Sequence, residues 1–278
     1  MSTVKVFKSE ESKNAIRTRY NQILSAFPFG QRYIDTPFAK TFLLESGSPE
    51  NPPLILLHGS CSNSAFWFSE IIALSAKYHV FAADIPGEAG NSEENRLTLQ
   101  SDEYADWLKA VFDALLIKSA VVMGTSLGSW MALKFAVKYP ECVSKLILIA
   151  PSGLSAQNAA ILEKAKQAAE KNEALTMDSS ISQGIKLPKE VLEFINLIVS
   201  GYFPIAEELP AFSDEQLKRL TMPVLFLAGK LDVMVNAPEA AKRLGGLLPH
   251  AEIHLLENTG HMVINSLEYV IPFLAKAS

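Results

Sequence analysis

Cysteine is scarce in this 278-residue chain, which contains only Cys61 and Cys142. Two cysteines without a spacing pattern supply neither a disulfide framework nor a zinc site, so we expect both to be thiols. Long hydrophobic runs are missing as well: nowhere do 18 apolar residues follow one another, and residues 1–20 hold no apolar stretch of the secretory kind. These absences predict a cytoplasmic protein with no membrane-spanning segment.

The chain also lacks any block of like charges, and its net charge is a modest −5. It therefore shows no basic footprint for nucleic acid. The five histidines are scattered without metal-ligand spacing, so we expect no metal and no other cofactor. With 49% hydrophobic residues the chain can bury a large core. We expect a globular monomer or homodimer whose partner is a small molecule.

Short apolar runs alternate with helical stretches over most of the chain, and a helix and an antiparallel edge pairing are expected before them. The expected helix covers Ser9–Phe27, and the arms of the pairing cover Arg32–Ile34 and Phe38–Leu44. The apolar runs are Leu54–Leu57, His79–Ala83, Ala120–Met123, Leu146–Ile149, Val224–Ala228 and Glu252–Leu256. Such runs suit parallel strands covered on both faces. The alternation predicts a doubly wound, mostly parallel α/β sheet.

The alternation stops between residues 151 and 212, where the pattern is helical and no strand is evident. Ser155–Asn172 and Pro188–Ser200 are the expected helices of this segment. The spacing of Ser213 to Gln216 fits a capping box, at which the core resumes. We therefore expect one α/β core built from residues 1–151 and 213–278, with residues 152–212 inserted as a helical cap.

Gly124-Thr125-Ser126-Leu127-Gly128 is the most informative motif of the chain. An expected strand leads into this G-x-S-x-G pattern and an expected helix leads out of it. At such a junction the glycines allow a tight, strained turn that holds the serine hydroxyl above the sheet, as a nucleophile elbow does. The motif predicts that Ser126 is a nucleophile and that the protein is a serine hydrolase.

A serine hydroxyl needs an imidazole to accept its proton, and the imidazole needs a carboxylate to orient it. In enzymes that carry their nucleophile on such an elbow, the acid and then the histidine follow it along the chain. His261, in a loop after the last expected strand, and Asp232, in the turn after Val224–Ala228, fit these roles. Asp84 also ends an expected strand, but it precedes the nucleophile, so we expect it to order its own loop.

The oxyanion formed by attack on a carbonyl needs backbone N–H donors. Leu127, directly after the nucleophile, should supply one of them. The loop that begins at His58 should supply the other, from Ser60 or alternatively from Cys61. We expect the imidazole of His58 to brace this loop rather than to take part in the chemistry.

Together with the elbow, four further motifs in this order resemble the α/β-hydrolase superfamily over nearly the whole chain: His58-Gly59, Asp84–Ser92, Gly229-x-x-Asp232 and Gly260-His261. Glu88 stands where that family often has a bulky or basic residue, and the pattern gives it no role. The N-terminal helix, the Phe-Gly turn after it, the edge strands and Trp67 are similar to bacterial carboxylesterases of the naproxen-esterase kind. This resemblance implies a cofactor-independent serine esterase.

The residues and the resemblance together predict hydrolysis of small to medium carboxylic esters through an acyl-enzyme. A C–C bond hydrolase or a cofactor-free perhydrolase would use the same residues, and a low-turnover small-molecule sensor on the same fold is a further alternative. Trp67 is expected either in the wall of the substrate pocket or in the core, and Ile198 and Tyr202 of the cap are expected at the pocket.

Overall fold

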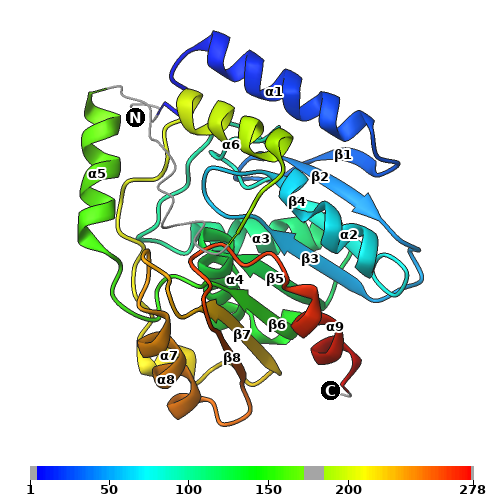
Figure 1. The fold of residues 1–278 in the computed structure, drawn as a ribbon. Coiled ribbons are helices and arrows are strands. Elements are labelled where there is room, and N and C mark those ends of the chain that lie inside the picture. Colours follow the sequence, from blue (N-terminus) through cyan, green and yellow to red (C-terminus); the bar gives the residue numbers. More distant parts are fainter. Residues whose placement is uncertain (1–4, 172–184, 277–278) are drawn as a thin grey trace.

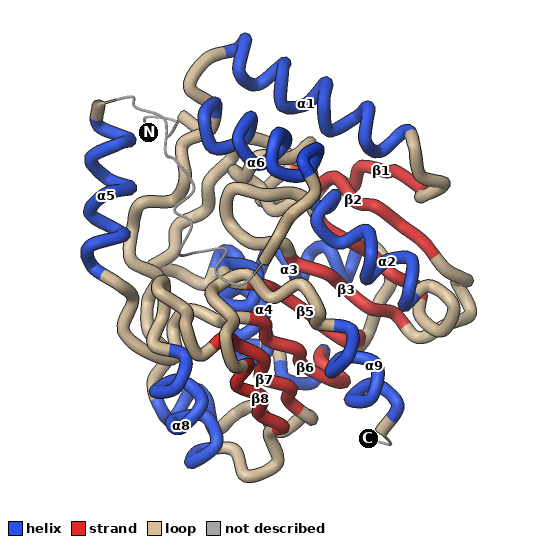
Figure 2. The backbone as a smooth tube through the Cα atoms, in the orientation of Figure 1, coloured by secondary structure: helices blue, strands red, loops and turns tan. Residues whose placement is uncertain are grey.

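The computed structural model describes residues 5–171 and 185–276, which form a central sheet with helices on both sides (Figures 1 and 2). The strands are β1 (Gly30–Asp35), β2 (Lys40–Ser46), β3 (Pro53–Leu57), β4 (His79–Ala83), β5 (Ala120–Thr125), β6 (Val143–Ile149), β7 (Val224–Gly229) and β8 (Glu252–Leu256). The α-helices are α1 (Glu10–Ser25), α2 (Phe68–Leu74), α3 (Glu103–Ala114), α4 (Leu127–Lys138), α5 (Ala159–Glu170), α6 (Lys189–Gly201), α7 (Asp214–Leu217), α8 (Ala237–Leu247) and α9 (Leu267–Ala275).

The eight strands form one sheet in the order β1-β2-β4-β3-β5-β6-β7-β8. β1 and β2 pair antiparallel at one edge, β2 pairs antiparallel with β4, and every other neighbouring pair is parallel. The prediction of a doubly wound, mostly parallel sheet with an antiparallel edge is thus confirmed. After β3 the chain steps outward to β4 and then back to β5 on the other side of β3, which makes the β3/β5 boundary a topological switch point. In open α/β sheets, ligands bind in the crevice beyond the carboxyl ends of the strands at such a point.

Successive strand residues face opposite sides of the sheet, and this divides the core into two layers. Ile55 and Leu57 of β3 face the layer that holds buried residues of α3, α4 and α8. Leu54 and Leu56 face the other layer, with buried residues of α1, α2, α6 and α9. Because both faces are covered, the central strands are apolar along their whole length, which is why they could be recognised as parallel strands from the sequence.

The helix expected over Ser9–Phe27 is α1. Ser9 is its N-cap, accepting a hydrogen bond from Ser12 N at 3.0 Å. The buried face of α1 meets α6, where the rings of Tyr20 and Phe194 stack with centroids 6.4 Å apart. Ahead of the helix, Phe7 forms an isolated antiparallel bridge with Tyr202, directly after α6. The N-terminal segment therefore holds α6 against the sheet from the side opposite to α3 and α4.

The segment between β6 and β7 contains α5 and α6, as its helical pattern predicted. It also contains an isolated bridge, from Gln157 to Val235, which that pattern did not predict. Asn172, the expected end of the first helix, lies outside the described residues. The capping box at Ser213 and Gln216 is present and begins α7. No helix in the described parts of the chain is long and apolar enough to cross a membrane.

Candidate active site

The G-x-S-x-G motif forms a sharp turn between β5 and α4, with Ser126 between them at φ 51° and ψ −113°. The two glycines are required by close backbone contacts. A Cβ on Gly124 would lie 2.3 Å from the carbonyl oxygen of Gly128, and a Cβ on Gly128 would lie 2.0 Å from that of Leu57. The second contact shows that α4 approaches the end of β3 as closely as backbone atoms allow. Ser126 consequently sits beside the loop that follows β3.

Loops from three strands bring Ser126, His261 and Asp232 into one hydrogen-bonded chain. His261 Nε2 lies 2.8 Å from Ser126 Oγ, and His261 Nδ1 lies 2.8 Å from Asp232 Oδ2. These residues follow β5, β8 and β7, whose carboxyl ends meet at one edge of the parallel sheet. The close approach of β7 to the histidine loop depends on Gly229, where a Cβ would lie 2.1 Å from the carbonyl oxygen of Thr259.

The surroundings of Asp232 determine how this chain of hydrogen bonds is directed. The side chain is fully buried, and its second oxygen, Oδ1, accepts from Met234 N at 2.8 Å and from Val235 N at 3.1 Å. A carboxylate with two amides on one oxygen presents the other as a pure acceptor, so His261 carries its proton on Nδ1. Nε2 is then free to accept the proton of Ser126. The arrangement can act as a base toward the serine hydroxyl.

The loop after β3 lies against the serine, because a Cβ on Gly59 would be 3.5 Å from Ser126 Cβ. Ser60 and Cys61, the two alternative oxyanion donors in this loop, differ in the hydrogen bonding of their backbone N–H groups. Cys61 N donates to Glu88 Oε2 at 3.1 Å. Ser60 N–H has no hydrogen-bond partner among residues 5–171 and 185–276. Leu127 is the first residue of α4, a position where a helix leaves the N–H without an intrahelical partner.

His58 and Asp84 hold this region together. His58 Nδ1 donates to Gly59 O at 2.8 Å, and its Nε2 accepts from Ile85 N at 2.9 Å, so the ring ties the loop after β3 to the loop after β4. Burial lowers the pKa of His58, which keeps the ring neutral and able to accept. The Asp84 carboxylate accepts from Tyr20 Oη at 3.0 Å, Ser64 N at 2.9 Å and Asn91 N at 2.7 Å. These donors lie on α1, at the start of the short 3-10 helix Ser64–Trp67 and in the loop after β4, and His261 is not one of them.

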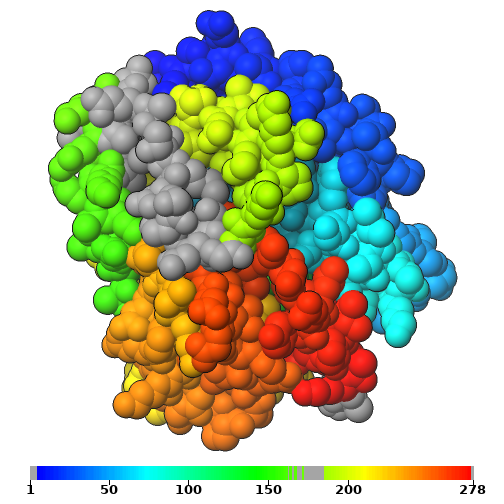
Figure 3. All heavy atoms as spheres, viewed as in Figure 1, coloured from blue at the N-terminus to red at the C-terminus, as the bar shows by residue number. Residues whose placement is uncertain are grey.

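Trp67, Ile198 and Tyr202 expose at most 4% of their surfaces and belong to the buried layer on the α1 and α6 side of the sheet. They fill the core in this structure, and their assignment to a substrate pocket stays a prediction. Figure 3 shows α6 on the surface between α1 and the segment that follows β8. Phe194 of α6 stacks on Phe66, six residues after Ser60, with ring centroids 5.9 Å apart. The helix thus packs close to the loop beside the serine.

Glu88 is the residue of this region that the sequence did not single out as functional. It is 2% exposed and lies beneath the loop after β3. Burial raises its pKa to about 7, while the Arg96 charge, the Tyr202 hydroxyl, the Cys61 N–H and the Ser60 hydroxyl oppose that rise. The sequence feature that could have identified Glu88 is its position, where the superfamily often has a bulky or basic residue.

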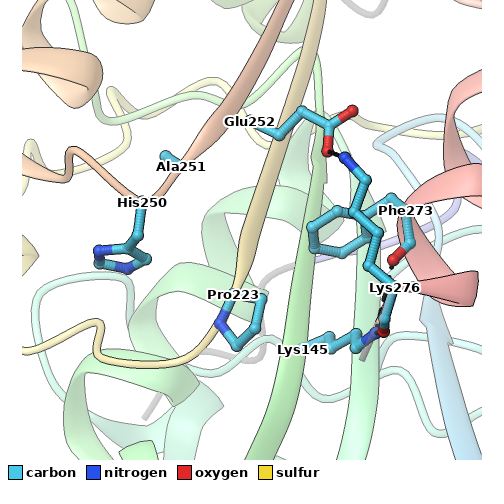
Figure 4. Close-up of a pocket in the computed structure, with 7 residues that line it drawn as sticks. All are labelled: Lys145, Pro223, His250, Ala251, Glu252, Phe273 and Lys276. Carbon is cyan, nitrogen blue, oxygen red and sulfur yellow. Dashed lines mark hydrogen bonds and ion pairs between the residues drawn. The ribbon is translucent and has the colours of Figure 1, made fainter. Parts of the chain in front are cut away.

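A cavity of about 320 Å³ lies elsewhere, lined by Lys145, Pro223, His250, Ala251, Glu252, Phe273 and Lys276 (Figure 4). Its lining comes from the end of α9 and from the amino ends of β6, β7 and β8, at the edge of the sheet opposite to Ser126. Lys145 Nζ donates there to the carbonyl oxygen of Leu274 at 3.2 Å, which caps the end of α9. The described residues also hold no cluster of three or more metal-ligand side chains. The hydrogen-bonded Ser126, His261 and Asp232 lie at the other, carboxyl edge of the sheet.

The chain is similar to several known carboxylesterases. The carboxylesterase YbfK of Bacillus subtilis is 29% identical over 95% of this chain and 93% of its own, and its crystal structure superposes with a TM-score of 0.82, covering 96% of this chain and all of that one. The uncharacterized carboxylesterase nap of the same organism is 29% identical over 91% of this chain and 89% of its own. The crystal structure of naproxen esterase from Bacillus subtilis gives a TM-score of 0.74 at 27% identity, over 93% and 95% of the two chains.

A family match covers residues 52–193, about half of the chain, from the start of β3 into α6. This stretch contains the loop beside Ser126, the elbow and the parallel strands on both sides of it. The remaining strands and the loops of Asp232 and His261 complete the same sheet. The chain belongs to the family described as the alpha/beta hydrolase fold.

Proposed function

We propose that this protein is a carboxylesterase that hydrolyses small to medium neutral esters, with Ser126 as nucleophile, His261 as general base and acid, and Asp232 as the orienting carboxylate. The observation that carries the proposal is the continuous chain of contacts from Asp232 Oδ2 through His261 to Ser126 Oγ, each of 2.8 Å. Nucleophile and base within hydrogen-bond reach, with the base oriented by a third group, are the geometric requirement for nucleophilic catalysis.

The proposed reaction proceeds in two halves. His261 Nε2 takes the proton of Ser126 as the oxygen attacks the ester carbonyl, and the oxyanion is held by the N–H groups of Leu127 and Ser60. The tetrahedral intermediate collapses, the C–O bond to the alcohol breaks, and His261 gives the proton to the leaving alcohol. Water then attacks the acyl-enzyme by the same steps, releasing the acid and restoring Ser126. Apart from the ester and water, every group in the proposed scheme belongs to the chain, so the scheme uses no cofactor.

The comparisons support an ester as the substrate, because the relatives matched over nine-tenths of the chain are named carboxylesterases.

Within the fold, residues 152–212 are proposed as a cap, and residues 1–151 and 213–278 as the core. α6 packs near the loop beside Ser126, and its sequence offers one basic residue, Lys189, at its exposed start. The lack of a basic cluster on α6 favours neutral over anionic substrates. A cytoplasmic location and a monomeric or homodimeric state complete the proposal.

A panel of p-nitrophenyl esters from acetyl to palmitoyl tests the activity and the size of the pocket together. We expect the highest kcat/KM at short to medium acyl chains, and a higher value for palmitoyl than for butyroyl would contradict the role given to the cap. Ser126→Ala should lower kcat by about 10⁴-fold or more, because the change removes only the nucleophilic oxygen. An organophosphonate should label Ser126 in the wild type. Retained turnover in the purified, folded Ser126→Ala variant would refute the assignment.

A further inference from the structure

Side chains fix two successive peptide units in the loop beside Ser126, the one between Gly59 and Ser60 and the one between Ser60 and Cys61. The N–H of Ser60 shares a peptide plane with the carbonyl of Gly59, and in a trans peptide the two groups point in opposite directions. Gly59 O accepts from His58 Nδ1 at 2.8 Å and from Ser62 Oγ at 2.7 Å. These two contacts turn the carbonyl toward the loop and the Ser60 N–H away from it.

The next peptide unit, between Ser60 and Cys61, is held by the Glu88 side chain. Its N–H, on Cys61, donates to Glu88 Oε2 at 3.1 Å. Cys61 has φ 56°, in the left-handed region that costs a residue with a Cβ about 1 kcal/mol or more. An unfavourable backbone conformation persists only when surrounding contacts hold it. Glu88 supplies such a contact from a different loop, 27 residues further along the chain.

Glu88 is itself held in a closed environment. The Arg96 guanidinium, which donates from Nε to Gly87 O at 3.1 Å, lies over the Tyr202 ring at 5.3 Å from its centroid. Burial and the Glu88 charge raise the pKa of the Tyr202 hydroxyl well above its ordinary value, so the phenol stays neutral beside the carboxylate. Glu88 Oε1 and the Tyr202 hydroxyl are both buried, and within the described part of the chain neither meets the geometry of a hydrogen bond, although the two groups lie close enough to shift each other's pKa. A carboxylate is an expensive group to bury, and among residues 5–171 and 185–276 the only backbone group that donates to this one is the Cys61 N–H.

We propose that Glu88 is a positioning residue for ester hydrolysis: by holding the Cys61 N–H, its carboxylate fixes the loop conformation in which the Ser60 N–H faces the developing oxyanion. The inference rests on the proposed function, because it concerns the transition state of that reaction. It also explains why Ser60 and not Cys61 is the donor, since the Cys61 N–H is already taken. Glu88 touches no reacting atom and acts only through the backbone.

Three substitutions separate the hydrogen bond from the charge. Glu88→Gln keeps an acceptor oxygen at the same reach, so kcat/KM should stay within a few-fold of the wild type. Glu88→Asp keeps the charge but withdraws it by about 1.5 Å, beyond hydrogen-bond distance of the Cys61 N–H. Glu88→Leu removes both. A displacement of about 1 Å at a catalytic group can cost about 10²-fold, so we expect Asp and Leu to lower kcat by that order with little change in KM.

A second measurement distinguishes positioning from general loosening of the fold. An alkyl boronic acid forms a tetrahedral adduct with the serine and needs the oxyanion donors, whereas the amide analogue of the substrate binds without forming one. Boronate affinity should fall in proportion to kcat/KM across the Glu88 series, and affinity for the amide should stay constant. The control is Glu70→Leu, which removes another buried carboxylate, one that accepts from Ser266 Oγ at 2.9 Å and from no amide of the loop beside Ser126.

The results separate failure of this inference from failure of the proposed function. Wild-type protein without esterase activity would overturn both. An active wild type with Glu88→Leu and Glu88→Asp equally active would overturn the positioning role alone. Loss of activity in Glu88→Gln with retention in Glu88→Asp, equal loss of boronate and amide affinity, or the same losses in Glu70→Leu would also overturn it.

Discussion

The contacts of Asp232 make the effect of its conversion to asparagine calculable. Oδ1 accepts from two backbone amides, so the carbonyl oxygen of an asparagine must stay there, because an NH₂ group in that place would face two donors. The NH₂ group then faces His261 Nδ1 and donates to it. This forces the imidazole proton onto Nε2, where it points at Ser126 Oγ and cannot accept the hydroxyl proton. The variant keeps its shape but holds the wrong tautomer.

A wrong tautomer of this kind lowers kcat by about 10⁴-fold in serine proteases, which corresponds to about 5.5 kcal/mol of transition-state stabilisation. We expect a loss of the same order for Asp232→Asn, measured as kcat with p-nitrophenyl butyrate. The melting temperature, measured in parallel, should change little because every hydrogen bond of the acid is replaced. A variant that keeps more than a tenth of wild-type kcat while folded would refute the tautomer argument.

Asp84→Asn is the matched control, because Asp84 also follows a strand and is also buried. Its carboxylate accepts from Tyr20 Oη, Ser64 N and Asn91 N, so an amide group leaves at least one of these donors facing another donor. An unpaired buried donor costs about 1–3 kcal/mol of stability and does not alter the histidine tautomer. We expect a lower melting temperature with kcat within about tenfold of the wild type. Equal loss of kcat in both folded variants would show that Asp84 takes part in the chemistry.

Gly128→Ala should lower the free energy of unfolding by about 1–3 kcal/mol, because the new Cβ would lie 2.0 Å from Leu57 O, and kcat should fall with it as the loop after β3 is pushed from Ser126; unchanged unfolding and kcat would contradict the packing. Glu88, whose pKa is raised by burial from 4.5 to about 7, favours the folded state most below pH 4.5 and loses that contribution as the pH rises through 7. The free energy of unfolding of Glu88→Gln, measured in urea, should therefore rise by about 3 kcal/mol relative to that of the wild type between about pH 4.5 and pH 8. The neighbouring groups do not change charge in this range, because Arg96 stays charged and Cys61, Tyr104 and Tyr202 have raised pKa values and stay neutral. A difference that stays constant with pH would contradict this link between the titration of Glu88 and stability. Neutral butyrate esters should have a higher kcat/KM than hemisuccinate esters of the same alcohol, and the reverse order would refute the apolar cap.

Much of the fold could be predicted from the chain because the relevant signals are local. A buried parallel strand must be apolar on both faces, so runs such as Val224–Ala228 are visible without knowledge of their neighbours. The elbow is equally local, since only glycine tolerates the backbone contacts on either side of Ser126. The order of Ser126, Asp232 and His261 follows from the order of the strands that carry them. These residues were therefore identifiable as candidates before their distances were known.

The features that the sequence left open depend on contacts between segments that are far apart in the chain. Whether Ser60 or Cys61 offers a free N–H was decided by Glu88, which reaches Cys61 from the loop after β4. The burial of Trp67, which is 4% exposed, likewise depends on helices that close over it from other parts of the chain, while its place at a substrate pocket stays a prediction. Periodicity reports which face of an element is apolar, but it carries no information on which distant residue that face or its loop will meet. Hydrogen-bond partners across loops exist only once the sheet has been assembled, and the tertiary structure alone supplies them.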